Sequence, residues 1–516
     1  MTLALDLAQR GVASVLLDDA DRIGEGSRAI CFAKRTLEIF DRLGVADRMV
    51  AKGVVWQKGR VFLRDDEIYS FDLLPESGHK MPAFINLQQY YVEQFLVEAI
   101  AAQPLVDLRW RNKVVGIERG GDGATITIET PDGPYEITAD WLVACDGARS
   151  PSRGLLGLDF AGEVFDDQFL IADVKMTGDL AGMGRNSFPP ERWFWFEPPF
   201  HSGQSALLHR QPDDIWRIDL QLGRDADADI ERRPEHVTPR IARMLGHDQF
   251  TLEWVSIYRF QCRRIERFVH DRVIFAGDAA HQVSPFGARG ANSGIQDADN
   301  LGWKLAAVLA GTAPTTLIAS YDSERSQAAD ENIGHSTRST DFIAPRTAAE
   351  RHFRTAALQL AAKADFAKRF INSGRLSTPT VYQSPLNTLD ADGVPTAEVG
   401  AALPDAALVG TGGTTSWLLH RMGRGFTVLY FGQLDGVVPI ADATLVELNL
   451  ADFNAATKQL LYERYGAGIG TTLVVRPDQH VCAVFAKFDA VAVTDAIKRA
   501  LGRVTAQNRE PENGSA

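Results

Sequence analysis

Apolar and polar residues follow two different periods along the chain, and residues 272–309 contain both. Val273, Ile274 and Phe275 form a short apolar run that ends at the Gly277–Asp278 pair, which is typical of a buried strand followed by a turn. A glycine-rich loop comes next, and a long helix is expected to begin near Ala291. This order of elements predicts a strand–loop–helix unit of an α/β protein.

The same unit favours a bound ligand. Gly287 and Gly290 in the loop allow the backbone to approach a flat or phosphorylated group closely, because glycine has no Cβ. The helix directs its free N–H groups and the positive end of its dipole toward that loop. Asp278 lies at the carboxyl end of the strand, which is the edge where open α/β sheets bind ligands.

The first residues predict the second half of a βαβ dinucleotide-binding unit. A short apolar helix is expected to end at Gly11, and a strand is expected to end at Asp18, where an acidic residue commonly bonds the adenosine ribose. The first strand and its GxGxxG loop are expected to lie just before residue 1. Either the start is assigned too late, or the chain is a truncated protein that binds the dinucleotide poorly.

The remaining pattern divides the chain into strand-rich and helical stretches. In order, it predicts a helix at 32–43, a helix at 86–102, a β-meander from 113, a strand-rich region at 166–268, helices at 315–374, a Ser/Thr/Pro/Asn-rich linker at 375–395, a mixed third unit at 396–505 and a polar, disordered tail at 506–516.

Composition narrows the possible partners. The chain has 516 residues and a formal net charge of −13, which argues against nucleic acid or an anionic membrane as a partner. No apolar run is long enough to span a membrane, and no signal peptide is recognisable. The 4 cysteines have no CxxC spacing, so neither a metal site nor a redox dithiol is expected, and a cytoplasmic location is predicted.

The stretch GDAAHQVSPFGARGANSGIQDADNLGWKL closely resembles the second FAD motif of the flavin-dependent aromatic hydroxylases, the family of para-hydroxybenzoate, phenol and 3-(3-hydroxyphenyl)propionate hydroxylases. The resemblance implies that Gly277 and Asp278 hold the ribityl chain of FAD and that Pro285 lies beside the flavin and the substrate. It also implies that the flavin N1–C2=O edge faces the loop and helix start, made of Gly287, Gly290, Ala291 and Asn292. The alternative is an ordinary strand–turn–helix without a ligand.

Other positions match the same family at its expected spacing. Arg28, in the sequence SRA, corresponds to an arginine that contacts FAD and lines the entrance to the active site, and Gln89 corresponds to a glutamine near the ribityl or phosphate region. Asp146 and Gly147 resemble the DG motif, which helps to hold the pyrophosphate and is implicated in nicotinamide cofactor binding. Alternatively, Arg28 is a solvated loop residue and Gln89 a surface amide.

The strand-rich region contains many aromatic residues that could enclose a substrate ring. Trp195 is the aromatic candidate. The polar candidates for binding a phenol or a carboxylate are His209, Arg217 and Tyr258. Arg217 alternates with apolar neighbours and could face either side of a sheet. Most aromatic residues on strands belong to the core, which is the alternative for each of these positions.

The expected fold class is α/β. The resemblance implies a Rossmann-like FAD-binding domain (first strand missing) with an inserted β-sheet substrate domain and a C-terminal thioredoxin-like domain. The FAD-binding domain would comprise residues 1–165 and 269–374, the substrate domain residues 166–268 and the thioredoxin-like domain residues 396–505. The last of these lacks CxxC, so a structural or dimerising role is expected, and a homodimer is predicted.

The family resemblance implies a monooxygenase. In such enzymes NADPH or NADH visits transiently and reduces FAD, and the reduced flavin activates O₂ for transfer of one oxygen to a phenolic ring. Pro285 and Arg28 are the expected residues beside the reacting groups. Two alternatives remain: another flavin enzyme of the same fold, such as a reductase or a halogenase, although no WxWxIP motif is present, and a truncated remnant that binds no FAD.

Overall fold

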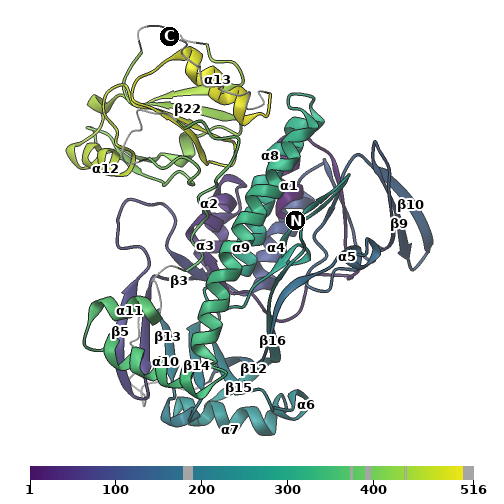
Figure 1. The fold of residues 1–516 in the computed structure, drawn as a ribbon, viewed down its shortest axis with the longest axis vertical. Helices are drawn as coiled ribbons and strands as arrows, with labels where there is room; N and C mark the ends of the chain where they lie inside the picture. The colour runs from purple at the N-terminus through teal and green to yellow at the C-terminus, as the bar shows by residue number, and fades with distance from the viewer. Residues whose placement is uncertain (178–189, 372–375, 390–396, 435, 437–438, 504–516) are drawn as a thin grey trace, which may run out of the picture.

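The computed structural model describes the chain except residues 178–189, 372–375, 390–396, 435, 437–438 and 504–516. Helices and strands are mixed throughout, which confirms the expected α/β class. Figure 1 shows three parts. A body of helices and short sheets lies around α8, a large sheet lies below it, and a smaller unit of sheet and helices lies at the C-terminal end of the chain.

The first part contains two small sheets with parallel pairs, β1 with β7 and β11 with β18, and β17 joins the second sheet antiparallel to β18. The bounds of these strands are Ser14–Leu17, Val106–Arg109, Leu142–Ala144, Val273–Phe275 and Val269–His270, respectively. The helices of this part include α1 (Thr2–Gln9), α4 (Gln89–Ala101), α5 (Pro151–Leu155) and α8 (Gly290–Leu309).

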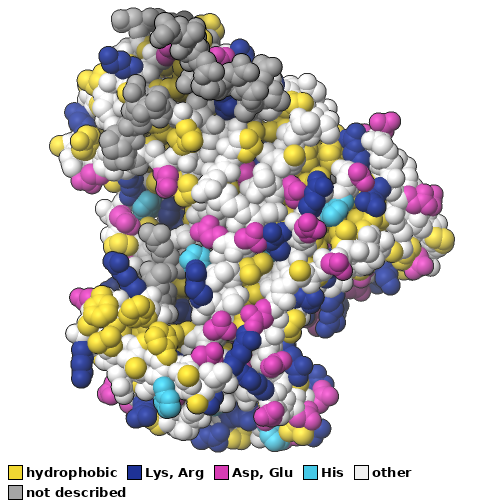
Figure 2. All heavy atoms as spheres, viewed as in Figure 1, with side chains coloured by type: hydrophobic (Ala, Val, Ile, Leu, Met, Phe, Trp, Pro, Cys, Tyr) yellow, Lys and Arg dark blue, Asp and Glu magenta, His cyan; other side chains and the backbone are white. Residues whose placement is uncertain are grey.

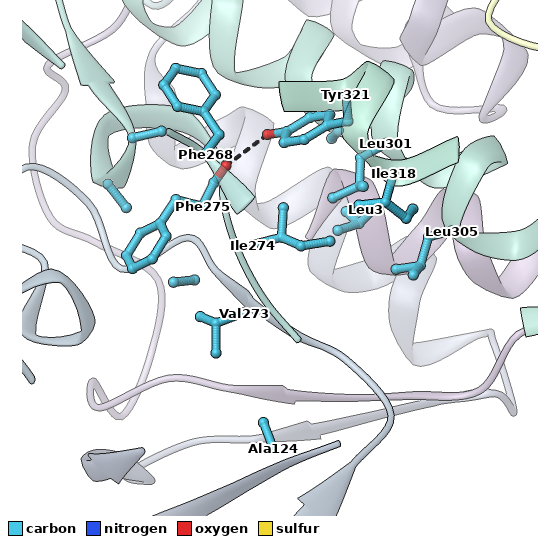
Figure 3. Packing of buried hydrophobic residues seen from close by; sticks show 14 of the residues in the cluster. Leu3, Ala124, Phe268, Val273, Ile274, Phe275, Leu301, Leu305, Ile318 and Tyr321 are labelled. Atoms are coloured by element: carbon cyan, nitrogen blue, oxygen red, sulfur yellow. Dashed lines mark hydrogen bonds between the residues drawn. The ribbon is translucent and has the colours of Figure 1, made fainter. Parts of the chain in front are cut away.

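Strand β18 lies in the centre of an apolar core. Its three residues pack against side chains from α1, α8 and α9, and Tyr321 donates a hydrogen bond of 2.7 Å to the carbonyl of Phe275 (Figure 3). Helices α1 and α8 approach each other closely at Gly302. A Cβ on this residue would lie 2.1 Å from Asp6 Oδ2. A larger residue at position 302 would displace the Asp6 carboxylate from the place where these two helices cross.

Two predicted helices begin later than expected. Residues 31–33 form strand β2 (Cys31–Ala33), and helix α2 covers Lys34–Arg42 and is followed by α3 (Ala46–Lys52). In the same way, residue 86 belongs to strand β6, before α4. The short strands join a three-stranded sheet of order β2–β6–β3, whose other members are β6 (Phe84–Asn86) and β3 (Val54–Trp56). The expected meander is a three-stranded sheet of β8 (Lys113–Arg119), β9 (Ala124–Thr130) and β10 (Gly133–Ala139).

The large sheet has eight strands and extends beyond the predicted range 166–268. Strands β4, β5 and β19 come from outside that range. Strand β4, for example, pairs in parallel with β13. The range was predicted from periodicity, which does not reveal which strands pair. The order is β19 (His281–Gln282), β16 (Phe250–Arg264), β12 (Ala161–Met176), β15 (Ile215–Gly223), β14 (Ser205–Arg210), β13 (Arg192–Phe196), β4 (Lys58–Leu63) and β5 (Asp66–Asp72).

The two faces of this sheet have different partners. One face packs against α7 (Pro234–Leu245), which follows the short helix α6 (Ala228–Glu231). The other face packs against Phe286, just after Pro285, and against the helices that follow α8. These helices are α9 (Ile318–Ile343), α10 (Ala348–Ala361) and α11 (Asp365–Ile371), within the stretch predicted to be helical.

The C-terminal part contains a four-stranded sheet of order β23–β22–β24–β25, in which only β22 and β23 are parallel. Its elements are β20 (Ala407–Val409), β21 (Thr415–Trp417), β22 (Phe426–Tyr430), β23 (Ala443–Glu447), α12 (Ala455–Tyr465), β24 (Thr472–Val475), β25 (Val481–Phe485) and α13 (Ala490–Ala500). Its thioredoxin-like character stays a prediction. The predicted tail 506–516 and parts of the predicted linker lie outside the described residues.

Buried ion pairs join the C-terminal part to α8 and α9. Arg476, in the turn between β24 and β25, donates hydrogen bonds of 2.7 and 3.0 Å to the two carboxylate oxygens of Glu324 on α9. Lys304 on α8 donates to the same carboxylate at 2.7 Å, and Asp478 pairs with Arg476. These side chains are at most 1% exposed, so each charge depends on its partners for the stabilisation that water would otherwise give.

Two kinds of feature are absent from the part of the chain that the structure describes. No helix there is long and apolar enough to cross a membrane. No group of three or more His, Cys, Asp or Glu side chains there is arranged to hold a metal ion.

The Glu324→Gln variant should be about 3–5 kcal/mol less stable to unfolding, because Lys304 and Arg476 would remain buried without their carboxylate. These two cations lower the pKa of Glu324 below its usual range. Its contribution is therefore complete above the usual range and is lost as the pH falls below that range toward the lowered pKa, so the deficit should shrink in acid. Denaturant unfolding as a function of pH measures both effects. Glu331→Gln, on an exposed position of α9, is the control, and equal stability of the two variants would contradict the role of the network.

Candidate functional site

The turn after β18 is held by one buried carboxylate. Gly277 has a φ of +62° and donates its N–H to Asp297 Oδ2 on α8 at 2.8 Å. His281 Nε2 lies 2.8 Å from the same oxygen, and Arg325 on α9 donates to Oδ1 at 2.5 Å. Asp297 is buried, yet Arg325 and His281 hold its pKa below the usual range. The carboxylate therefore stays charged and fixes the turn to both helices.

Asp278 is the free carboxylate of this turn. It is exposed and has no hydrogen bond to any described residue. The surrounding protein still raises its pKa by desolvation, and its charge interacts with His281 and with Arg28. A carboxylate that is accessible but poorly solvated favours a hydroxyl-rich ligand, which can donate the hydrogen bonds that water supplies incompletely.

The loop after this turn leads directly into α8. Pro285 is exposed, and Gly287 has a φ of +104°, a backbone conformation that favours glycine. Helix α8 begins at Gly290, so the N–H groups of its first turn, including that of Ala291, have no intrahelical acceptor. Asn292 fixes this end, because its side chain accepts the N–H of Ala33 and donates to the carbonyl of Cys31, each at 2.9 Å.

The turn and the helix start lie unusually close together. A Cβ on Gly294 would lie 3.2 Å from the Cα of Gly277, so a larger residue at position 294 would press on the backbone of the turn. The structure thus brings together the predicted positions of this motif: Gly277, Asp278, Pro285, Gly287, Gly290, Ala291 and Asn292.

The loop that carries Arg28 is fastened to the large sheet. Arg217 on β15 donates hydrogen bonds to the carbonyls of Ser27 and Arg28, while Asp173 on β12 accepts from the same guanidinium at 2.8 and 2.9 Å. Gln89 accepts the N–H of Ala29 at 3.2 Å. Arg217 and Gln89 therefore position this loop. The Arg28 guanidinium itself is exposed and lies 5.7 Å from the centre of the Tyr258 ring.

The two other acidic positions lie at the ends of strands. Asp18 follows β1, is exposed and accepts the N–H of Ala20 at 2.9 Å. Asp146 follows β11, and its two oxygens accept the Ser150 hydroxyl at 2.6 Å and the Ser152 N–H at 2.9 Å. Gly147 beside it has a φ of +78°. Asp146 therefore stabilises the DG turn and the start of α5, rather than projecting a free carboxylate.

The predicted substrate residues lie on opposite faces of the large sheet. His209, Arg217 and Tyr258 share the face that packs against Phe286. Trp195 lies on the other face, in the core beneath α7, where its ring stacks on Phe62 with centres 5.2 Å apart. The structure does not bring Trp195 to the site. Strand alternation places residue 195 with its neighbour 193 on the α7 face, which sequence alone could not assign.

Sequence analysis missed several polar residues that the fold adds to this face. Asn86 on β6 accepts the indole N–H of Trp56 at 2.7 Å and donates to the carbonyl of Arg210 at 2.8 Å. Asp219 alternates with the buried Ile218 and Leu220 on β15. The alternation of polar and apolar residues in RIDLQLG was the signal for this second polar position, since Arg217 and Asp219 are two residues apart.

FAD fits the residues around α8. The unpartnered Asp278 carboxylate offers an acceptor for a ribityl hydroxyl, and the first turn of α8 offers N–H groups at its positive end. The contact between Gly277 and Gly294 keeps both elements free of side chains on that side. Taken together, these features define an α/β protein that binds a dinucleotide cofactor next to a large, mostly antiparallel sheet.

Comparison with known proteins agrees with this class. The family described as FAD binding domain matches residues 1–336, and the chain belongs to that family. A flavin-dependent monooxygenase of Mycobacteroides abscessus is 32% identical over 351 residues, which cover 65% of this chain and 71% of that one. A 12-dehydrotetracycline 5-monooxygenase/anhydrotetracycline 6-monooxygenase of Streptomyces rimosus is 28% identical and covers 97% of this chain and 96% of its own.

Solved structures support the fold over nearly the whole chain. The flavin-dependent monooxygenase PieE, in complex with FAD and substrate, has a TM-score of 0.81 at 21% identity and covers 98% of this chain and 97% of its own. The substrate-free rebeccamycin biosynthetic enzyme RebC has a TM-score of 0.73 at 26% identity, with coverages of 98% and 96%. The resemblance to flavin-dependent aromatic monooxygenases is thereby confirmed, and FAD is the cofactor.

Replacing Asp278 with alanine should weaken FAD binding about 10-fold to 100-fold, because a hydrogen bond to a charged group is worth about 1.5–3 kcal/mol. The dissociation constant of FAD, measured by reconstituting the apoprotein, checks this. Asp140→Ala, on an exposed residue between β10 and β11, is the control. Unchanged FAD affinity in Asp278→Ala would rule out the assigned contact.

Proposed function

We propose that the protein hydroxylates a phenolic aromatic compound with NADPH or NADH and O₂. The main support is one juxtaposition. The loop of Pro285 leads from the FAD-binding turn into Phe286, and Phe286 packs on the face of the large sheet that carries His209 and Tyr258. A ring bound against that face would lie between the sheet and the flavin.

Each element has a separate part in this proposal. Asp278 and the first turn of α8 hold FAD, with Asp18, Asp146 and Gly147 near its nucleotide half. Reduced by the nicotinamide donor, FAD supplies the chemistry that activates O₂. The apolar core around Phe169, Phe260 and Phe286 limits the access of water to the reacting groups. Arg28 lies over the Tyr258 ring and flanks the entrance.

The size of the substrate is suggested by which relatives match the whole chain. The relative from Streptomyces rimosus, which is named for tetracycline-type compounds, matches 97% of this chain. A 3-(3-hydroxy-phenyl)propionate/3-hydroxycinnamic acid hydroxylase of Mycolicibacterium smegmatis matches 67% of it. Fused-ring phenols therefore join phenylpropanoid acids as the first candidates. A homodimer and a cytoplasmic location stay predictions.

Phenolic substrates should accelerate NAD(P)H oxidation by the FAD-loaded protein and should gain one oxygen atom from O₂. A panel of phenylpropanoid acids, simple phenols and hydroxylated anthraquinones, incubated under ¹⁸O₂ and analysed by mass spectrometry, tests both. If FAD is bound but every compound leaves NAD(P)H oxidation unchanged and gains no ¹⁸O, the hydroxylase proposal is wrong and a reductase becomes the better assignment.

A further inference from the structure

One buried guanidinium contacts both elements that are assigned to FAD. Besides its bond to Asp297, which holds the turn after β18, Arg325 donates from Nη2 to the carbonyl and the hydroxyl of Ser293, at 3.2 and 3.0 Å. Ser293 lies in the first turn of α8, directly after Asn292. Arg325 on α9 is completely buried. Its position therefore sets the turn and the start of α8 relative to each other.

The other terminal nitrogen of Arg325 is held from outside the region predicted to bind FAD. Nη1 donates a hydrogen bond of 2.7 Å to the hydroxyl of Tyr382, in the segment predicted to be a linker. Burial raises the pKa of Tyr382 to about 12, so this hydroxyl stays neutral and offers its oxygen to the guanidinium. Of the hydrogen-bond partners of Arg325 in the described part of the chain, Tyr382 alone lies beyond residue 374.

Tyr382 is itself fixed by the C-terminal part. Its backbone N–H donates to the carbonyl of Gly400 at 3.0 Å, and its carbonyl accepts from the Asn387 side chain at 2.9 Å. Gly400 has a φ of +94°, and a Cβ there would lie 2.2 Å from the Tyr382 carbonyl oxygen, which disfavours any larger residue at this position. The Tyr382 ring packs against His480, in the turn between β24 and β25, with ring centres 4.6 Å apart. The hydroxyl therefore reaches Arg325 from a rigid position.

Packing alone accounts for the ring of Tyr382 but not for its hydroxyl. The ring lies near two guanidinium groups, with its centre 6.0 Å from Arg325 and 5.6 Å from Arg476, and phenylalanine could make the same contacts. The hydroxyl has one hydrogen-bond partner among the described residues, the guanidinium of Arg325. Ring and hydroxyl can therefore be separated by a single substitution.

We propose that Tyr382 is a positioning residue for FAD. Its hydroxyl orients Arg325, and Arg325 in turn aligns the turn after β18 with the first N–H groups of α8. The C-terminal part thereby helps to build the cofactor site through hydrogen bonds. This inference rests on the position proposed for FAD beside α8, and it does not depend on which substrate is hydroxylated.

Loss of the hydroxyl should affect reduced FAD most. The Nη1 end of the Arg325 guanidinium would lose its acceptor in a buried place, and the N–H groups at the start of α8 would be held less precisely. Reduced FAD carries negative charge near that helix end, so its stabilisation depends on the alignment of these groups.

Tyr382→Phe tests this role, because it removes the hydroxyl and keeps the ring. In the full chain loaded with FAD, the midpoint reduction potential of the bound flavin should become more negative. FAD should also bind about 3-fold to 10-fold more weakly, the range for the loss of one net hydrogen bond. Spectroelectrochemical titration measures the potential, and reconstitution of the apoprotein measures the dissociation constant.

Tyr465→Phe is the matched control. Tyr465 on α12 is also completely buried, but its hydroxyl donates to the carbonyl of Pro404 at 2.6 Å, a bond within the C-terminal part. Both variants should lower the free energy of unfolding, because each loses a buried hydrogen bond. Only Tyr382→Phe should change the reduction potential and the affinity for FAD.

A double variant shows whether Tyr382 acts through Arg325. Arg325→Lys keeps the charge and loses the forked contacts, so it should shift the potential in the same direction. If the two residues act in one chain, adding Tyr382→Phe to Arg325→Lys should cause no further shift. Should Arg325→Lys fail to fold, the comparison of Tyr382→Phe with Tyr465→Phe decides alone.

Two outcomes would overturn the assignment. One is an unchanged potential and FAD affinity in Tyr382→Phe, and the other is an equal change in Tyr465→Phe, which would reflect general stability. If the position proposed for FAD were wrong, Asp278→Ala would leave FAD affinity unchanged as well. If only the hydroxylase function were wrong, the shift in Tyr382→Phe would persist while no phenol accelerated NAD(P)H oxidation.

Discussion

The site depends on the buried carboxylate of Asp297. It accepts the N–H of Gly277 from the turn after β18, contacts His281 and pairs with Arg325 on α9. One side chain thus sets the position of the turn relative to two helices. Asp278 can be left without a partner because the turn does not depend on it for its shape. Asp297 builds the turn and Asp278 faces the ligand. Because these are two different side chains, the Asp278 carboxylate can stay accessible.

The two faces of the large sheet have different roles. The face under α7 carries an apolar cluster that packs against this helix, and the cluster contains Trp195. The opposite face combines an aromatic cluster beside Phe286 with polar groups that the protein satisfies only in part. Arg217 belongs to the satisfied set, since it ties the loop of Arg28 to the sheet. On strand β15, Arg217 therefore holds a loop in place, whereas Asp219, two residues further on, has a buried carboxylate oxygen without a hydrogen bond.

The sequence was sufficient to predict the α/β class and the turn, loop and helix around Asp278, because glycine spacing and strand–helix periodicity are local signals. It was not sufficient for the faces of the large sheet. Periodicity places Arg217 and Asp219 on one side of β15, but which side meets Phe286 depends on pairing with distant strands such as β4. For the same reason Trp195 was expected near the substrate, and Asp219 was not considered.

The turn between β24 and β25 has a consequence for attempts to recombine this chain. Its Arg476 and Asp478 complete a charge set whose other half, Lys304 and Glu324, belongs to the helices that carry the site. A foreign C-terminal unit fused at the linker would leave that half unmatched in an apolar interior. Chimaeras between relatives should therefore exchange the β24–β25 hairpin together with the matching positions on α8 and α9, because these residues form one buried charge network.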